Sequence, residues 1–220
     1  MTTSSELVVV PSHLNKLARI LRGRFADLLL FAITSTALVV LFRIQSNFRL
    51  IDWLYVLQHL LVLLFALTRS EALVADCSAD SNIAVGVAYL HPYAVAMCLQ
   101  WWPGKVACPR AGLVLTTVAA IFGVVCLLTI NDRFGVRPAL RGLVTRGPYR
   151  LVRHPLYLSY LIAELGYNLQ LRNFGSILFG LLGWACMVYR IIAEERVVSK
   201  DPNWAAYVAG VPYRLVPGLW

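Results

Sequence analysis

Charged side chains are scarce in this chain. Of its 220 residues, 14% are Asp, Glu, Lys or Arg, whereas soluble proteins average about 25%. Hydrophobic residues make up 59%, which is typical of a membrane protein. A membrane-spanning helix needs roughly 17 to 25 mostly apolar residues, so the length allows several spans joined by short loops. It leaves no room for a sizeable soluble domain, and any chemistry must lie among helices or at their ends.

Cysteine is sparse as well and lacks a useful arrangement. No C-x-x-C pair occurs among the five cysteines: Cys77, Cys98, Cys108, Cys126 and Cys186. This spacing predicts neither a disulfide framework nor a zinc site. We therefore expect no bound metal.

Acidic residues are few: Asp and Glu total 11 against 20 Lys and Arg, which gives a net charge of +9. A basic excess can indicate nucleic-acid binding, but in a membrane protein it is first explained by loops held on the cytoplasmic side. If both termini are cytoplasmic, only five basic residues lie on the other side: Arg43, Arg49, Lys105, Arg110 and Arg172. The charge therefore predicts cytoplasmic N- and C-termini and requires no nucleic-acid partner.

Apolar runs predict about six spanning helices, near residues 26–42, 51–68, 82–102, 110–130, 156–171 and 174–192. His91-Pro92 interrupts the third run, and a proline removes a helix hydrogen bond, so five spans are also possible. The predicted fold class is all-α, a multi-pass transmembrane helical bundle with a cytoplasmic loop and a C-terminal interfacial helix. We expect the N-terminal helices in 1–130 and the residues that carry chemistry in 131–220.

The segment 131–155, NDRFGVRPALRGLVTRGPYRLVRHP, is longer than a simple connector and contains six arginines, three prolines and three glycines. Its aliphatic and aromatic side chains favour an ordered loop, although an electrostatic anchor to anionic lipid heads is an alternative. Pro155 suits the first position of the fifth helix, because its missing N–H needs no partner there. The free N–H groups of this helix start, with Arg153 or His154 beside them, predict a site for a carboxylate or phosphate.

A polar stripe enters the membrane along the fifth helix. Tyr157, Glu164 and Asn168 follow helical spacing on one face. A glutamate in hydrocarbon is costly, so Glu164 is a functional candidate, with a neutral, hydrogen-bonded packing role as the alternative. Only Arg172-Asn173 separates the fifth and sixth helices, so a tight hairpin should bring Arg190 and the pair Glu194-Glu195 near His154 and Tyr157.

The C-terminal segment predicts one short helix. Asp201 is a good N-cap, Pro202 a good first residue and Gly210 a plausible stop. Such a helix could lie at the membrane interface and cover the site, or it could act as a passive aromatic anchor.

The run GLVTRGPYRLVRHPLY, then Gly166, Glu194-Glu195 and the closing YRLVP, together resemble the isoprenylcysteine carboxyl methyltransferase family and its bacterial relatives, over about residues 131–217. One of these motifs alone would be weak, but as an ordered set they are specific. The resemblance implies that 131–220 forms an S-adenosylmethionine site. By position, the residues matching cofactor contacts of the family are Leu143, Val144, Tyr149, His154, Pro155, Leu156, Tyr157 and Glu194. Arg190 matches an arginine assigned to substrate contact.

The implied function is an integral membrane methyltransferase that uses S-adenosylmethionine on a lipidic or prenylated acceptor, with carboxyl O-methylation preferred. In that reaction Arg190 would orient the acceptor carboxylate, which is already ionised and needs no base. For an amine acceptor, Glu195 or Glu164 would be the first candidates to accept a proton.

Three alternatives stay open. A phospholipid or lipid-amine N-methyltransferase fits the same pocket, and a sterol-reductase-like protein would use it for a nicotinamide cofactor. A non-catalytic transporter or scaffold would need Glu164, His59 and His91 to form a polar path across the membrane. In every case membrane lipids are expected as partners.

Overall fold

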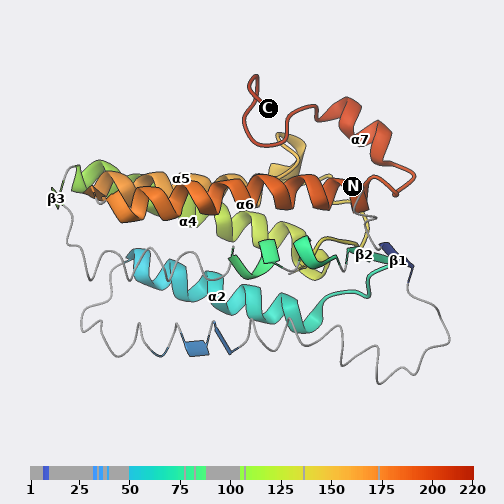
Figure 1. Cartoon of the computed structure of the whole chain (residues 1–220), viewed down its shortest axis with the longest axis horizontal. Coiled ribbons are helices and arrows are strands. Elements are labelled where there is room, and N and C mark those ends of the chain that lie inside the picture. Colours follow the sequence, from blue (N-terminus) through green and yellow to red (C-terminus); the bar gives the residue numbers. More distant parts are fainter. Residues whose placement is uncertain are drawn as a thin grey trace.

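The computed structural model describes residues 7–9, 32, 33, 35, 36, 39, 50–76, 78–81, 83–87, 105, 106, 108–135, 137–172 and 174–220. Within these ranges the protein is mostly helical (Figure 1). The helices are α2 (Leu50–Thr68), α4 (Pro109–Ile130), α5 (Pro155–Gln170), α6 (Phe174–Val198) and α7 (Trp204–Gly210), with short 3-10 turns η1 (Asn131–Arg133) and η2 (Gly147–Arg150).

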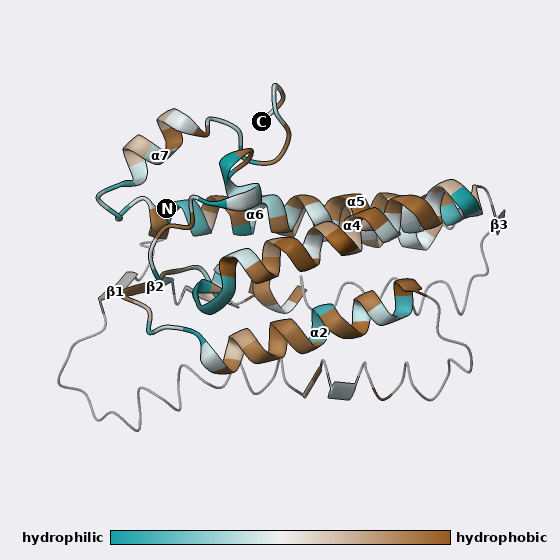
Figure 2. Cartoon of the chain, turned by 180° about the vertical axis from the view of Figure 1, so that it is seen from behind, coloured by the Kyte–Doolittle hydropathy of each residue, from teal (hydrophilic) through white to brown (hydrophobic). Residues whose placement is uncertain are grey.

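Three of the described helices are long and apolar enough to cross a membrane: Leu50–Thr68, Pro109–Arg133 and Phe174–Val198. Hydrophobic residues cover much of α2 and α4 (Figure 2). The predicted spans at 51–68, 110–130 and 174–192 correspond to these helices. Most of the predicted runs 26–42 and 82–102 lies outside the described residues, so the expected count of six stays a prediction.

The fifth predicted span is a helix, α5, of 16 residues. At a rise of about 1.5 Å per residue it is roughly 24 Å long, shorter than the hydrocarbon core of about 30 Å. It begins at Pro155, as predicted for a proline that needs no N–H partner at that position. The next helix, α6, continues six residues past the predicted end of its apolar run and includes Glu194 and Glu195.

Two short antiparallel sheets join distant parts of the chain, which the all-α prediction did not include. In the first, the strand order is β1 (Leu7–Val9), β2 (Val74–Asp76) and β4 (Ala139–Leu140). Val74 pairs with Val9 on one side and with Leu140 on the other. In the second, β3 (Lys105–Val106) pairs with β5 (Leu171–Arg172) at the opposite end of the helices.

The 131–155 segment is ordered over its described residues, and the first sheet is one reason. β4 lies within it and pairs with β2, so this segment is hydrogen-bonded to the chain that follows α2. Phe134 packs in a core cluster with Cys126, Leu127 and Leu156. The loop is therefore held against the end of α4 and the start of α5, where the run of motif residues lies.

The helices α4 and α5 lie side by side along their length, and α2 packs on α4 (Figure 1). Glycines permit the close approach of α4 and α5: a Cβ on Gly166 would lie 2.7 Å from Thr116 Cγ2 and 2.9 Å from the carbonyl oxygen of Gly112. Such small-residue contacts are usual between membrane helices. These contacts fix α5 against α4. The other face of α5 meets α6.

Candidate functional site at the loop end of α5 and α6

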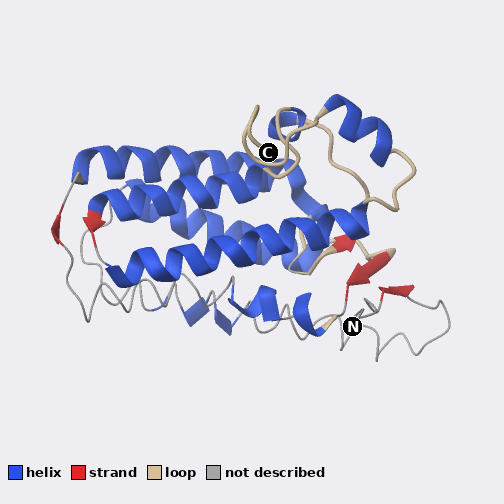
Figure 3. Ribbon diagram, turned by 45° about the horizontal axis from the view of Figure 1, so that its top comes forward, coloured by secondary structure: helices blue, strands red, loops and turns tan. Residues whose placement is uncertain are grey.

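The functional candidates gather at one end of the helices, which we call the loop end. It contains the 131–155 segment, the start of α5, the last turns of α6, and α7 with the C-terminal segment (Figure 3). α5 runs away from the loop end and is joined to α6 at the opposite end of the helices. α6 therefore returns the chain to the loop end. The predicted hairpin therefore does bring Glu194 and Glu195 to His154 and Tyr157.

The chain just before α5 is paired with the C-terminal segment. The backbone N–H of Arg153 donates to the carbonyl oxygen of Tyr213, and that of His154 donates to the carbonyl oxygen of Arg214, each at 2.9 Å. These two N–H groups are therefore already satisfied by protein. The anion site predicted at this helix start must use other donors.

Glu195 is the carboxylate that Arg153 and His154 meet. Its Oε1 lies 2.8 Å from Arg153 Nε and 3.2 Å from His154 Nε2, and its Oε2 lies 2.8 Å from Arg214 Nε. Arg153 also donates to the carbonyl oxygens of Val211 and Pro212. Two guanidinium groups stabilise the ionised carboxylate, which makes Glu195 a poor proton acceptor. This environment favours a role in holding the C-terminal segment.

The other predicted residues of this end form a second group beside that cluster. Tyr157 donates its hydroxyl hydrogen bond to Glu194 Oε2 at 2.9 Å. The guanidinium carbon of Arg190 lies 5.5 Å from the centroid of the Tyr157 ring. The ring centroids of His154 and Tyr157 are 5.7 Å apart. A carboxylate, a guanidinium, a phenol and an imidazole thus converge from α5 and α6.

Tyr149, from η2, completes this group from the loop side. The residue is 6% exposed, and its hydroxyl is buried without a hydrogen-bond partner among the described residues. Burial raises the pKa of Tyr149 well above its usual value, and Cys126, Glu194, Tyr160 and Tyr157 contribute in the same direction. The phenol therefore stays protonated and can donate to a bound molecule.

Tyr207 of α7 supports Tyr149 from the other side. Its hydroxyl donates to the backbone carbonyl oxygen of Tyr149 at 2.8 Å, and burial raises the pKa of Tyr207 to about 12. The helix itself begins later than predicted. Asp201 closes a turn by accepting from the backbone N–H of Asn203, and Asn203 rather than Asp201 is the N-cap of α7.

The remaining predicted cofactor contacts occupy the same end but differ in burial. Pro155 and Leu156 are buried at the start of α5. Leu143 and Val144 are half-buried in the 131–155 segment, where the guanidinium of Arg133 donates to the carbonyl oxygen of Leu143. They belong to the wall of the loop end.

Glu164 lies apart from this group. It is 8% exposed, and its Oε2 accepts a hydrogen bond from Trp184 Nε1 at 3.1 Å. Below it, Ser176 donates to Asn168 Oδ1 at 2.9 Å. Seven residues, or two helical turns, separate Glu164 from Tyr157, so Glu164 is not part of the loop-end group.

These contacts form a continuous line between α5, with the two residues before it, and α6. We call it the polar seam, made of five contacts: Glu195 with Arg153 and with His154, Glu194 with Tyr157, Trp184 with Glu164, and Ser176 with Asn168.

The sequence alone placed Glu195 near His154 but did not reveal its pairing with Arg153 and Arg214. Arg214 belongs to the motif YRLVP, but its distance in sequence from α5 gave no reason to pair it with Glu195. Trp204 and Trp220 were also missed, and they lie under Arg153 and Arg214 at 5.9 and 5.1 Å from ring centroid to guanidinium carbon. The sequence offered two signals for these contacts. Arg153 lies next to the start of α5, and Arg214 lies near Trp220 in the C-terminal segment.

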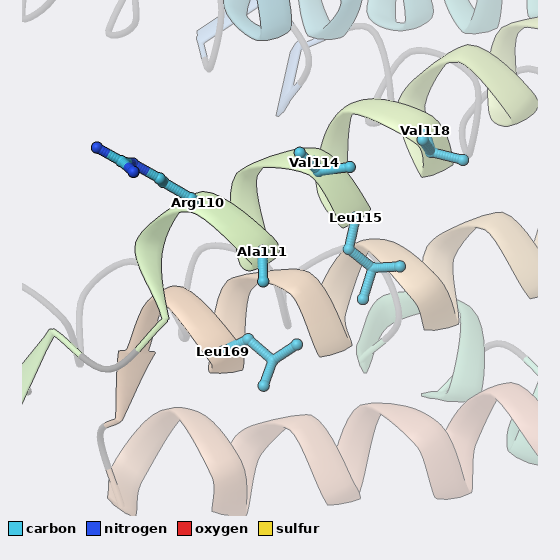
Figure 4. A pocket seen from close by; sticks show the side chains of 6 residues that line it. All are labelled: Arg110, Ala111, Val114, Leu115, Val118 and Leu169. Atoms are coloured by element: carbon cyan, nitrogen blue, oxygen red, sulfur yellow. The ribbon is translucent and has the colours of Figure 1, made fainter.

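A wide hollow among the described residues lies elsewhere. It has a volume of about 510 Å³ and lies beside the first turns of α4 and the end of α5, away from the loop end (Figure 4). Val114, Leu115, Val118 and Leu169 line it, while the side chain of Arg110 points away from it. This open apolar surface suits lipid chains, and no polar side chain points into it. The described residues also contain no group of three or more His, Cys, Asp or Glu that could bind a metal ion.

Long apolar helices with charged residues collected at one end define an integral membrane protein. Residues 112–200 match the model of the isoprenylcysteine carboxyl methyltransferase (ICMT) family. The matched range contains nearly all of α4, the 131–155 segment, α5 and α6, which carry the polar seam. It confirms the family resemblance expected from the motifs.

Individual relatives agree over parts of the chain. Protein-S-isoprenylcysteine O-methyltransferase A of Arabidopsis thaliana is 29% identical over 107 residues, 46% of this chain and 52% of the relative. Cobalt-zinc-cadmium resistance protein CzcN of Cupriavidus metallidurans is 30% identical over 116 residues, 50% of this chain and 51% of the relative. Protein-S-isoprenylcysteine O-methyltransferase of Schizosaccharomyces pombe is 46% identical over 54 residues, 24% and 23% of the two chains. The chain thus spans about half the length, or less, of these curated relatives.

Among solved structures, the eukaryotic intramembrane Ras methyltransferase ICMT aligns with 93% of this chain and 87% of its own, at a TM-score of 0.45 and 17% identity.

Proposed function

We propose that the protein is an integral membrane methyltransferase that uses S-adenosylmethionine and acts on a lipidic or prenylated acceptor, with carboxyl O-methylation as its reaction. The observation that carries this proposal is the convergence of Tyr157, Arg190 and Glu194 beside the buried hydroxyl of Tyr149. Two relatives named as O-methyltransferases of S-isoprenylcysteine support the reaction class.

The loop-end residues fit S-adenosylmethionine chemically. Its ammonium group complements the carboxylate of Glu194, which Tyr157 holds in place. Its other polar groups offer acceptors for the Tyr149 hydroxyl, which otherwise stays buried and unsatisfied. The proposed cofactor contacts are Leu143, Val144, Tyr149, His154, Pro155, Leu156, Tyr157 and Glu194.

When bound, the cofactor supplies a methyl group on a sulfonium, which an acceptor oxygen can displace directly. The protein's own part is then alignment and exclusion of water, and proximity of this kind contributes up to about 7 to 11 kcal/mol in favourable cases. Arg190, held over the Tyr157 ring, would bind the acceptor carboxylate and direct it. No residue has to form a covalent bond.

Proton transfer distinguishes this reaction from its main rival. A carboxylate acceptor needs no base, whereas an amine acceptor must lose a proton. Glu195 is ion-paired with two arginines, and Glu164 lies two turns from Tyr157. Neither environment favours proton acceptance at the loop end, which is why we prefer the carboxylate acceptor.

We also propose six spans with both termini on the cytoplasmic side, and α7 at the membrane interface. The distribution of Lys and Arg supports this topology, since only five of the 20 basic residues lie on the other side of the membrane under that arrangement. Single cysteines at Arg137 and Lys105, in a variant whose native cysteines are replaced, would report it by labelling of sealed vesicles with an impermeant maleimide. Labelling of both positions from the same side would contradict the topology.

The central test uses purified protein in lipid nanodiscs, incubated with methyl-labelled S-adenosylmethionine and total lipid of its host. A base-labile labelled product indicates an ester, and a base-stable product indicates a methylated amine. Glu194→Gln should abolish cofactor binding and product, whereas the matched exposed variant Glu71→Gln should retain both. Failure of the wild-type protein to bind S-adenosylmethionine would refute the methyltransferase proposal.

A further inference from the structure

Tyr149 has two polar ends with different surroundings. Its side-chain hydroxyl is buried and has no hydrogen-bond partner among the described residues. Its backbone carbonyl oxygen accepts a hydrogen bond from the hydroxyl of Tyr207 at 2.8 Å. A buried donor without a partner costs free energy in the free protein and is ready to donate to a bound molecule. The direction of the Tyr149 hydroxyl therefore matters for binding, and it depends on the backbone that carries the ring.

That backbone is one short 3-10 turn, η2 (Gly147–Arg150). On the α4 side, Gly147 has a φ of 56°, which L side chains rarely adopt, and a Cβ there would lie 3.1 Å from Thr129 Oγ1. The N–H of Tyr149 donates to the carbonyl oxygen of Arg146 at 3.2 Å, which is at the long end of the usual range. Hydrogen bonds of 3-10 turns have poor geometry. A contact from outside the turn therefore has a large share in fixing Tyr149.

The helix α7, which lies outside the long helices at the loop end (Figure 1), supplies that contact from a fixed position. At its start, the Trp204 ring centroid lies 5.9 Å from the guanidinium carbon of Arg153. Just past its end, the carbonyl oxygens of Val211 and Pro212 accept from Arg153 Nη1 at 3.0 and 2.8 Å. Arg153 is itself buried beside the start of α5. Tyr207 therefore lies on a helix that is attached at both ends to one buried arginine.

The hydroxyl end of Tyr149 faces the proposed cofactor contacts. Burial raises the pKa of Tyr149 well above its usual value, and the neighbouring Glu194 and Tyr157 add to the rise. The hydroxyl thus lies within electrostatic reach of the pair that Tyr157 and Glu194 form at 2.9 Å. Binding groups work when hydrogen bonds behind them hold them within about 0.5 Å of the productive position. A shift of η2 would be passed through the rigid Tyr149 ring to its hydroxyl.

We propose that Tyr207 is a positioning residue for cofactor binding: it holds the Tyr149 carbonyl oxygen and thereby directs the Tyr149 hydroxyl at the polar groups of S-adenosylmethionine. This role rests on the proposed function, because it needs the cofactor at the loop end. It also separates α7 from a passive aromatic anchor, which needs aromatic rings at the interface but no hydroxyl hydrogen-bonded to η2. Tyr207 acts through Tyr149 and does not itself contact the cofactor.

The test is a double-mutant cycle on the Kd for S-adenosylmethionine, measured by calorimetry in nanodiscs. Tyr207→Phe and Tyr149→Phe each remove one hydroxyl and keep the ring. Each should raise the Kd roughly fivefold, as the loss of one hydrogen bond of ordinary strength predicts. The double variant should stay near fivefold, because Tyr207 acts through the Tyr149 hydroxyl. Independent effects, as a merely structural role would give, would multiply to about 25-fold.

Tyr213→Phe is the matched control. Tyr213 is exposed in the same C-terminal part of the chain, and it contacts Arg153 through its backbone carbonyl oxygen rather than its hydroxyl. It should leave the Kd unchanged. Hydrogen exchange without cofactor gives a second readout: Tyr207→Phe should speed exchange of the amides in 147–152 severalfold and leave those of α4 unchanged, whereas Tyr213→Phe should change neither.

The outcomes distinguish the positioning role from the proposed function. If the wild-type protein binds no S-adenosylmethionine, the proposed function fails and the positioning role fails with it. If the wild type binds but Tyr207→Phe binds equally well, or the two effects multiply, the proposed function stands and the positioning role is overturned. Unchanged exchange of the 147–152 amides in Tyr207→Phe also overturns it, since the Tyr207 hydroxyl would then not hold η2.

Discussion

The two faces of α5 are built in different ways. On the α4 face, backbones approach so closely that a Cβ on Gly112 would lie 2.5 Å from the carbonyl oxygen of Gly166. On the α6 face, few backbone contacts are close, and side chains bridge the gap through the polar seam. One face is a rigid backbone contact, and the other is a set of hydrogen bonds and ion pairs around open space.

This difference separates support from binding. Close-packed small residues leave no space for a ligand and have no groups to recognise one. A polar seam offers donors and acceptors, but each of its groups costs free energy when it is unpaired in the membrane. The proposed chemistry therefore belongs to the α6 side of α5, and the α4 side should respond to substitution only through stability.

The largest effect should come from the first contact of the seam. Glu195→Ala leaves Arg153 buried without its carboxylate, and breaking one partner of a buried ion pair costs about 3 to 5 kcal/mol. We expect the C-terminal segment to detach, because Arg214 and Arg153 both lose their anchor. Limited proteolysis with mass detection of 211–220, together with thermal unfolding in detergent, measures this. The exposed Glu71→Ala is the control, and unchanged protease resistance in Glu195→Ala would contradict the role.

The α4 face should show the next largest effect. Gly166→Ala places a Cβ against the Thr116 side chain and the backbones of Thr116 and Gly112, and overpacking of this kind costs about 1 to 3 kcal/mol. Gly86→Ala, where nothing lies within 4 Å of the added Cβ, should cost far less. Chemical unfolding of both variants gives the comparison. Equal stability of the two would show that α4 and α5 are not close-packed.

Loss of the Tyr157 hydroxyl should weaken binding at the loop end more than stability. Tyr157→Phe keeps the ring under Arg190 but removes the hydrogen bond to Glu194. A hydrogen bond to a charged group contributes about 1.5 to 3 kcal/mol, so the Kd for S-adenosylmethionine should rise roughly tenfold or more. Calorimetric titration measures it, with Tyr213→Phe as the control. A Kd equal to that of the wild type would remove Glu194 from the cofactor site.

The sequence predicted the elements better than the contacts. Pro155 gave the start of α5, and the two-residue link Arg172-Asn173 gave the hairpin that joins Tyr157 to Glu194. The end of α6 was predicted too early, because the apolar run stops where the helix leaves the proposed membrane, while the helix itself continues to Val198. The residue type of Asp201 predicts a helix N-cap, but in the structure Asp201 closes the turn before α7 and Asn203 is the N-cap.

Other features could not be predicted from the sequence because they join parts of the chain that are distant in sequence. Strands of two or three residues, such as β2 and β4, carry too little alternation to be recognised. The pairing of Arg153 and Arg214 with Glu195 depends on where the C-terminal segment folds, which no local pattern states.

The smallest effect on stability should come from Gly180→Ala, which is the counterpart of Gly166→Ala on the other face of α5. The added Cβ meets the end of a flexible side chain, Glu164, rather than backbone. The gain in helix propensity from Gly to Ala, about 1 kcal/mol, should offset much of the cost, so the unfolding free energy should change by less than about 1 kcal/mol. A loss as large as that of Gly166→Ala, measured in the same unfolding experiment, would mean that α5 and α6 are as closely packed as α4 and α5.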